Sequence, residues 1–115
     1  MQYLCAVYFE PQALEALSAT ERAELDRNSL AYDKELERSG HYVVAHALQS
    51  VATAKTLRRR RGKVTSIDGP FAETKEHLGG FILIEAKDMD EAVEIASKIP
   101  MAGVGSVEVR PTMKF

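Results

Sequence analysis

The hydrophobic positions of this chain predict four strands. Residues 3–9 and 81–86 are apolar at both alternating sets of positions, which is typical of strands covered on both faces. Residues 41–49 alternate weakly between apolar and polar side chains, and residues 106–110 form a last short run closed by a proline. We therefore expect a sheet in which these two strands are hydrophobic on both sides.

Two helices are predicted between these strands. Ser18 followed by Glu21 is a capping box, and Gly40 ends the helix at about residue 39. Its inner stripe is formed by Leu25, Tyr32 and Leu36. Residues 12–17 are either a loop or one short helical turn.

The second helix begins at the N-cap Asp88 with Glu91 three residues later, and Pro100 ends it. Its apolar residues follow the i, i+3, i+4, i+7 spacing of a packed helix: Ala92, Ile95, Ala96 and Ile99.

Residues 55–61 and 63–68 predict a hairpin that turns at Gly62-Lys63 and is long enough to project from the fold. Arg58 to Arg61 lie in it. Their side chains alternate between faces, so only about two can follow one nucleic-acid backbone, and the hairpin offers no aromatic stacking platform. We interpret them as a solvated edge that discourages aggregation, and we do not expect a nucleic-acid partner.

Residues 68–80 form a polar loop between two strand-like runs. Gly69 and Pro70 cannot continue a strand. Gly69 allows a positive φ angle, and Pro70 lacks the backbone N–H that a strand ladder needs. Phe71 is expected to anchor the loop, and residues 72–77 to form a single helical turn before Gly79 and Gly80 lead into the next strand.

The resulting order is strand, helix, strand, inserted hairpin, strand, helix, strand. Without the hairpin this is the ferredoxin-like βαββαβ frame of an α+β protein, in which two helices cover one face of an antiparallel sheet. Because residues 3–9 and 81–86 are apolar on both sides, the second face needs another cover. We expect a homodimer with sheets packed face to face, a dimeric α+β barrel.

Composition agrees with one domain over residues 1–115: the chain is 45% hydrophobic with a net charge of -2. The single cysteine, Cys5, lies in an apolar run and is expected to be a buried thiol in a reducing cytosol. No signal peptide or membrane span is evident, so we expect a cytoplasmic protein without a membrane partner.

The candidate chemistry gathers in the loop. Asp68, Glu73, Lys75 and Glu76 could line a cleft beneath it and bind a ligand, or they could pin the loop through caps and ion pairs. Arg110 could anchor an anionic ligand or pair with Glu76. Asp68 is also a weak candidate for catalysis.

The three histidines are weaker candidates for a functional site than the loop residues. His46 shares a predicted strand face with Tyr42 and Val44, and it is either a weak catalytic candidate or a core or interface side chain. His41 and His77 are expected at the surface. No ligand spacing predicts a metal, no phosphate-binding glycine loop is present, and no cofactor is expected.

The motifs Asp-Gly-Pro-Phe-Ala-Glu-Thr-Lys-Glu at residues 68–76, Leu-Gly-Gly-Phe at 78–81 and Val-Glu-Val-Arg-Pro at 107–111 resemble the DGPF branch of the YCII-related family. The resemblance implies a dimeric α+β barrel. The wider family is described with a possible catalytic pair, a histidine on the first helix and an aspartate near the end of the second. Those positions hold about Ser29 and Ile99 in this chain, so the pair is missing.

Two functions fit the sequence. The first is a dimer that binds, and could transform, a small molecule between the sheet and the loop of residues 68–80. The second is a regulatory or interaction module, which the resemblance implies because relatives occur beside extracytoplasmic-function sigma factors.

Overall fold

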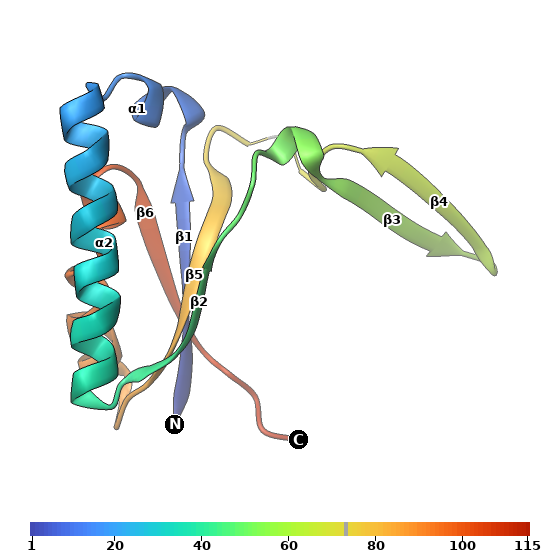
Figure 1. Cartoon of the computed structure of the whole chain (residues 1–115). Coiled ribbons are helices and arrows are strands. Elements are labelled where there is room, and N and C mark those ends of the chain that lie inside the picture. Colours follow the sequence, from blue (N-terminus) through green and yellow to red (C-terminus); the bar gives the residue numbers. More distant parts are fainter. Residues whose placement is uncertain (73) are drawn as a thin grey trace.

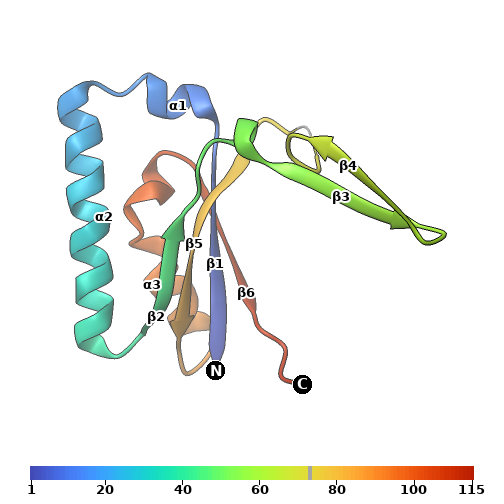
Figure 2. The ribbon, with the colours of Figure 1, turned by 45° about the vertical axis from the view of Figure 1, so that its right-hand side comes forward.

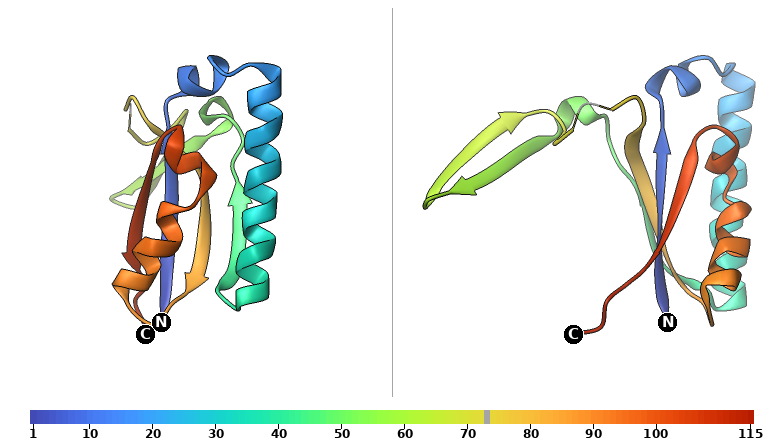
Figure 3. Two further views of the ribbon diagram at one scale, coloured as in Figure 1. Left: turned by 90° about the vertical axis from the view of Figure 1, so that its left-hand side faces the viewer. Right: turned by 180° about the vertical axis from the view of Figure 1, so that it is seen from behind.

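The computed structural model describes residues 1–72 and 74–115 of the chain. An antiparallel sheet in the order β2-β5-β1-β6 is built from β1 (Gln2–Phe9), β2 (Tyr42–Ala47), β5 (His77–Glu85) and β6 (Ser106–Pro111). Two helices, α2 (Ala19–Ser39) and α3 (Met89–Ser97), lie on the same side of it (Figures 1 and 3). The predicted α+β ferredoxin-like fold is therefore confirmed.

Local sequence signals fix the helix boundaries. The Ser18 hydroxyl accepts a hydrogen bond from the Glu21 amide at 3.1 Å, and the Glu21 carboxylate accepts one from the Ser18 amide at 2.9 Å, so the capping box forms. Gly40 ends α2 with φ of 81°, which favours glycine. Asp88 caps α3, and Pro11 begins the short helix α1 (Pro11–Glu15), which settles the alternative left open for residues 12–17.

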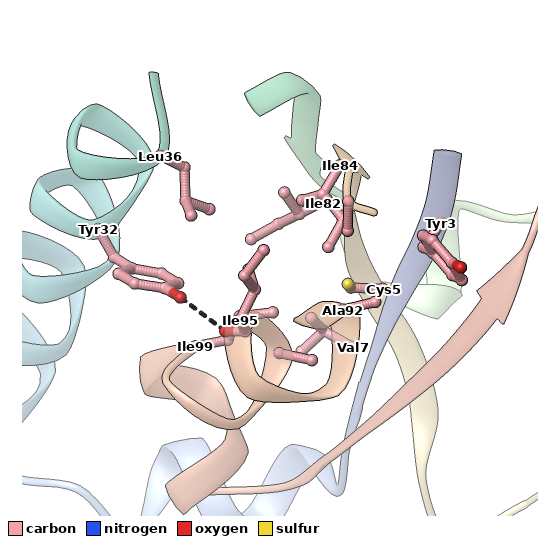
Figure 4. Close-up of a cluster of buried hydrophobic side chains, with 12 residues drawn as sticks. Tyr3, Cys5, Val7, Tyr32, Leu36, Ile82, Ile84, Ala92, Ile95 and Ile99 are labelled. Carbon is pink, nitrogen blue, oxygen red and sulfur yellow. Dashed lines mark hydrogen bonds between the residues drawn. The ribbon is translucent and has the colours of Figure 1, made fainter. Parts of the chain in front are cut away.

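The core lies between the helices and the sheet (Figure 4). Its sheet side comes from β1 and β5, where Cys5 and Ile84 are fully buried. The Tyr32 hydroxyl of α2 donates a hydrogen bond of 2.6 Å to the carbonyl oxygen of Ile95 in α3, which ties the two helices together across the core. The predicted helix stripes thus face the sheet.

The inserted hairpin is a separate two-stranded sheet made of β3 (Lys55–Arg60) and β4 (Lys63–Asp68). It projects from the side of the sheet opposite α2 and α3 (Figures 1 and 3). The radius of gyration is 16.0 Å, whereas a compact chain of this length has about 13 Å. The prediction that the hairpin would project is therefore confirmed, and we call residues 55–68 the arm.

The segment between the arm and β5 differs from expectation. The strand β5 begins at His77, and the described residues 72 and 74–76 are not helical, so the predicted helical turn is wrong. Gly79 and Gly80, expected just before the strand, lie within β5, and a Cβ on Gly80 would lie 2.8 Å from the carbonyl oxygen of His46. The glycines therefore permit close strand packing.

Two further expectations are corrected. Phe71 does not anchor the loop, because its side chain is 75% exposed. Tyr42 does not share a face with Val44 and His46, because the β2–β5 register shifts between Tyr42 and Val44. This bulge brings Tyr42 against the core while Val44 and His46 pair with Leu83 and Phe81 on the other face.

Candidate functional site

A cavity of about 700 Å³ lies between the segment that follows the arm and the end of β2. One wall comes from the turn η1 (Val51–Thr53) and the other from the first residues of β5. Tyr8 and Phe71 supply aromatic surface. The polar lining consists of Gln49, Ser50, Thr53, Thr74, Glu76 and His77. We call this space the loop cavity.

Hydrogen bonds hold the walls of the loop cavity in place. The Gly69 amide donates to the Ala54 carbonyl oxygen at 2.8 Å, and the Thr56 hydroxyl donates to the Gly69 carbonyl oxygen at 2.9 Å. The Glu76 carboxylate accepts a hydrogen bond of 3.1 Å from the Ser106 hydroxyl of β6. The loop is therefore tied to both the arm and the sheet.

Three of the predicted ligand-binding residues of the loop lie in the described part of the chain: Asp68, Lys75 and Glu76. Of these, only Glu76 lines the loop cavity. Asp68 instead pairs with Lys55 at 2.9 Å at the base of the arm, where its side chain is 85% exposed. Lys75 is exposed and outside the lining. Glu73 lies outside the described residues.

Arg110 and His46 lie elsewhere. The Arg110 guanidinium contacts the Glu108 carboxylate at 2.9 Å, so the pair expected between Arg110 and Glu76 is not formed. Both residues of the observed pair lie on β6 and are exposed. The His46 ring lies 5.9 Å from that of Phe81, on the face of the sheet that the helices leave uncovered.

A second cleft, of about 650 Å³, lies between α2 and the β2 side of the sheet, and we call it the helix cleft. Its walls are mostly apolar, with Asp26, Ser29 and Asp33 among its polar lining residues. Burial raises the pKa of the Asp33 carboxyl, and the negative charge of nearby Glu37 raises it further. Asp33 therefore keeps its proton more readily than an ordinary aspartate.

Sequence reasoning missed most of the loop cavity. Tyr8 looked like one more apolar strand residue, and His77 looked like a surface residue because the start of β5 was placed too late. Gln49 carried no signal, since it was assigned to a strand end. The arrangement offers hydrogen-bonding groups beside aromatic walls, which suits a small, mostly uncharged organic molecule. Among the residues that the structure describes, no cluster of three metal-ligating side chains is found.

The sheet face turned away from the helices, which we call the open face, is apolar in its middle and polar at its β6 edge. Across the strands, Val44, Leu83 and Leu4 lie in one row that ends at Arg110. His46, Phe81 and Ala6 lie in the next row, which ends at Glu108. This face is therefore suited to packing against another protein surface.

No helix in the described part of the chain is long and apolar enough to cross a membrane.

Comparison with known proteins places these features in a family. The model of the YCII-related domain matches residues 1–115. An uncharacterised protein of Rhizobium meliloti (strain 1021) is 35% identical over 113 residues, which cover 96% of this chain and 91% of that protein.

Among solved structures, 5-chloro-2-hydroxyhydroquinone dehydrochlorinase of Burkholderia phenoliruptrix AC1100, in complex with 2,5-dihydroxybenzoquinone, has a similar fold. The TM-score is 0.57 at 21% identity, with 98% of this chain and 94% of that chain covered. At this identity the likeness describes the fold.

Proposed function

The chain belongs to the YCII-related domain family, and from this premise we propose that it is a homodimer that binds a small organic molecule in the loop cavity. The observation that carries this proposal is the cavity itself. It has about 700 Å³, combines aromatic walls with six polar side chains, and lies beneath the segment that the sequence singled out. Ligand sites of small molecules have this size and mixed lining.

The chemical class of the ligand follows from the lining. Glu76 and His77 offer hydrogen-bonding groups, while Tyr8 and Phe71 offer flat apolar surface. A molecule with an aromatic or quinone-like ring and hydroxyl groups fits both. That the dehydrochlorinase of similar fold was solved with a dihydroxybenzoquinone supports this class without identifying the ligand.

The dimer part of the proposal rests on the open face. Leu4 is 36% exposed and lies in a row with Leu83 and Val44, yet no described helix covers this side. A second copy packed through the same face would cover it with a self-complementary surface. Within the family, the motif at residues 68–76 supports assignment to the DGPF branch.

The experiment is a thermal-shift screen with hydroxylated aromatic and quinone compounds. A ligand present at about 100 times its dissociation constant stabilises the native state by about 2.7 kcal/mol, which raises the melting temperature by several degrees. Wild type and the control Glu108→Gln should respond equally, because Glu108 lies outside the cavity. Glu76→Gln and Ala72→Trp, which alter the lining, should lose the shift.

A Ser29→Trp variant tests whether the ligand binds in the helix cleft instead, because Ser29 lines the helix cleft and not the loop cavity. Loss of the ligand response in Ser29→Trp, with Ala72→Trp responding normally, would move the site to the helix cleft and overturn the proposal. If no compound shifts the wild type, the regulatory or interaction module becomes the better account, and the exposed arm is the observation that favours it.

A further inference from the structure

The arm is unusually exposed for a β-hairpin. Leu57, Val64 and Ile67 are 65%, 57% and 59% exposed, and Thr56 is the one arm residue that is half-buried. An isolated two-stranded hairpin is marginally stable in water at best. The arm contacts its own chain through the Thr56 hydroxyl, which donates to the Gly69 carbonyl oxygen, and through the Arg58 guanidinium, which lies 5.1 Å from the centre of the Phe71 ring. These contacts leave its apolar side chains exposed, so the arm needs a further surface to pack against.

The register shows what the arm offers. The cross-strand pairs Leu57–Ser66 and Arg59–Val64 share one face, while Thr56–Ile67 and Arg58–Thr65 share the other. Each face thus combines an arginine with an apolar side chain. Such a surface suits a protein partner, since a nucleic-acid backbone would use the arginines of one face and leave the apolar side chains in water.

Charge separates the arm from the rest of the chain. Residues 55–68 contain six basic side chains and one acidic one, a formal charge of +5. The whole chain carries -2, so the other 101 residues carry -7. The body of a second copy therefore carries a net charge opposite in sign to that of the arm, and in a two-fold dimer this attraction acts twice.

The position of the arm points to the same partner. The arm leaves the fold on the side of the open face, opposite α2 and α3 (Figures 1 and 2). Its six-residue strands extend about 20 Å, whereas packed sheets lie about 10 Å apart. A copy lying against the open face is therefore within reach of the arm.

We infer that the arm is a clasp that docks on the acidic body of a second copy, so that each subunit of the dimer holds the other. This inference rests on the proposed dimer. The open face supplies the apolar contact, and the arm adds a charged contact that depends on salt.

Sedimentation velocity at about 50 mM and 500 mM salt tests the clasp. A variant with Arg58 to Arg61 all replaced by Gln should dissociate at least tenfold more readily than wild type at low salt, and the difference should shrink at high salt. The matched control replaces four basic residues of the body by Gln: Arg27, Lys34, Lys87 and Lys114. It loses the same charge, but it should dimerise at least as well as wild type.

The outcomes distinguish the clasp from the dimer. Equal dissociation constants for the wild type and the four-glutamine arm variant at both salt concentrations would overturn the clasp and leave the dimer intact. A monomeric wild type would overturn the dimer as well. Leu83→Lys, on the open face, should abolish the dimer even with a normal arm, which shows that the assay detects that face.

A photo-crosslinking amino acid in place of Thr65 gives a second readout. Mixed with a copy of different mass, it should link the arm to the body of the other copy, and links confined to its own chain would contradict the clasp.

Titration of the wild type with a duplex DNA of about 20 base pairs completes the test. Tight binding with a steep salt slope, lost in the four-glutamine variant, would assign the arm to nucleic acid instead.

Discussion

Gly105 lies where β6 begins beside the end of β1, and its missing side chain is what allows this approach. A Cβ there would overlap the carbonyl oxygen of Tyr8, which is a backbone atom and cannot rotate away. Gly103, two residues earlier, has open space around the same position and no left-handed backbone angle. The two glycines form a natural pair for comparison.

We expect Gly105→Ala to lower the free energy of unfolding by about 2 to 4 kcal/mol, because the strand pair must shift to accept the methyl group. Gly103→Ala should change it by less than about 0.5 kcal/mol. Urea denaturation of both variants measures the difference. Similar stability of the two would show that β6 can move without cost.

Two buried acids make the fold sensitive to alkali. Burial raises the pKa of the Cys5 thiol from 9.0 to about 11, and burial, followed by the charges of Glu35, Cys5 and Glu94, raises the pKa of Tyr32 from 10.0 to about 12. In each case the folded chain holds its proton more tightly than the unfolded chain. The resulting stability is complete below the unfolded pKa and is lost as the pH rises toward the folded pKa.

Stability should therefore fall between about pH 9 and pH 12. In Tyr32→Phe the decline should become shallower between about pH 10 and pH 11, where Cys5 still titrates, and should disappear above about pH 11. The variant is less stable at neutral pH because it lacks the hydrogen bond to Ile95. Urea midpoints measured at intervals of one pH unit in the presence of a reductant give the slopes. An unchanged slope in the variant would mean that another group titrates.

At this scale the sequence identified Tyr32 and Leu36 correctly, because helical spacing alone fixes which side chains face the sheet. It failed for Arg110 and Asp68, since an ion pair depends on the register and on which neighbour is nearest. Arg110 forms an ion pair with Glu108 on its own strand, and Asp68 forms one with Lys55 on the neighbouring strand of the arm.

Helix α2 shows how far a local signal can predict an element. Its capping box formed as its four-residue pattern requires, because every atom involved lies within one turn. The segment from residue 68 to residue 80 was less predictable. Gly79 and Gly80 could have formed a turn or allowed close packing of strands. The choice depends on Phe9 and β2, which approach these glycines only in the folded chain.

The same cap gives a prediction at this scale. Ser18→Ala should lower the free energy of unfolding by about 1 kcal/mol, because the Glu21 amide loses its acceptor. Thr20→Ala, in the exposed first turn, is the control and should be nearly neutral.

Acid should reduce the effect of Ser18→Ala. Hydrogen bonds from the Ser18 backbone and side chain lower the pKa of Glu21 from 4.5, so the stability they provide is present above that value and lost as the pH falls through the folded pKa. Chemical denaturation at pH 7 and near pH 3 compares the two conditions. A difference that does not shrink in acid would mean that the Ser18 hydroxyl does not contribute to the lowered pKa of Glu21.

For the whole molecule, the sequence predicted the order of elements and the projecting hairpin, since both follow from strand and turn patterns. It could not predict the loop cavity. That space is bounded by η1, β1 and β5, which are far apart in sequence and meet only in the folded chain.

Trypsin provides a test at this scale, because the arm carries four consecutive arginines. If a second copy covers the arm, cleavage there should be slow well above the dissociation constant of the dimer and at least several times faster well below it. The control is a peptide substrate in the same reaction, which reports the activity of the protease. Equal cleavage of the arm at both protein concentrations would mean that dimerisation leaves the arm uncovered.

The full burial of Cys5 has a practical consequence. It is the only thiol in the sequence, and a maleimide dye cannot reach it in the native state. A cysteine introduced at Thr65 would therefore take the label alone, without any need to remove the native sulfur. Energy transfer between dyes on two such subunits would then serve as a molecular ruler for the arms.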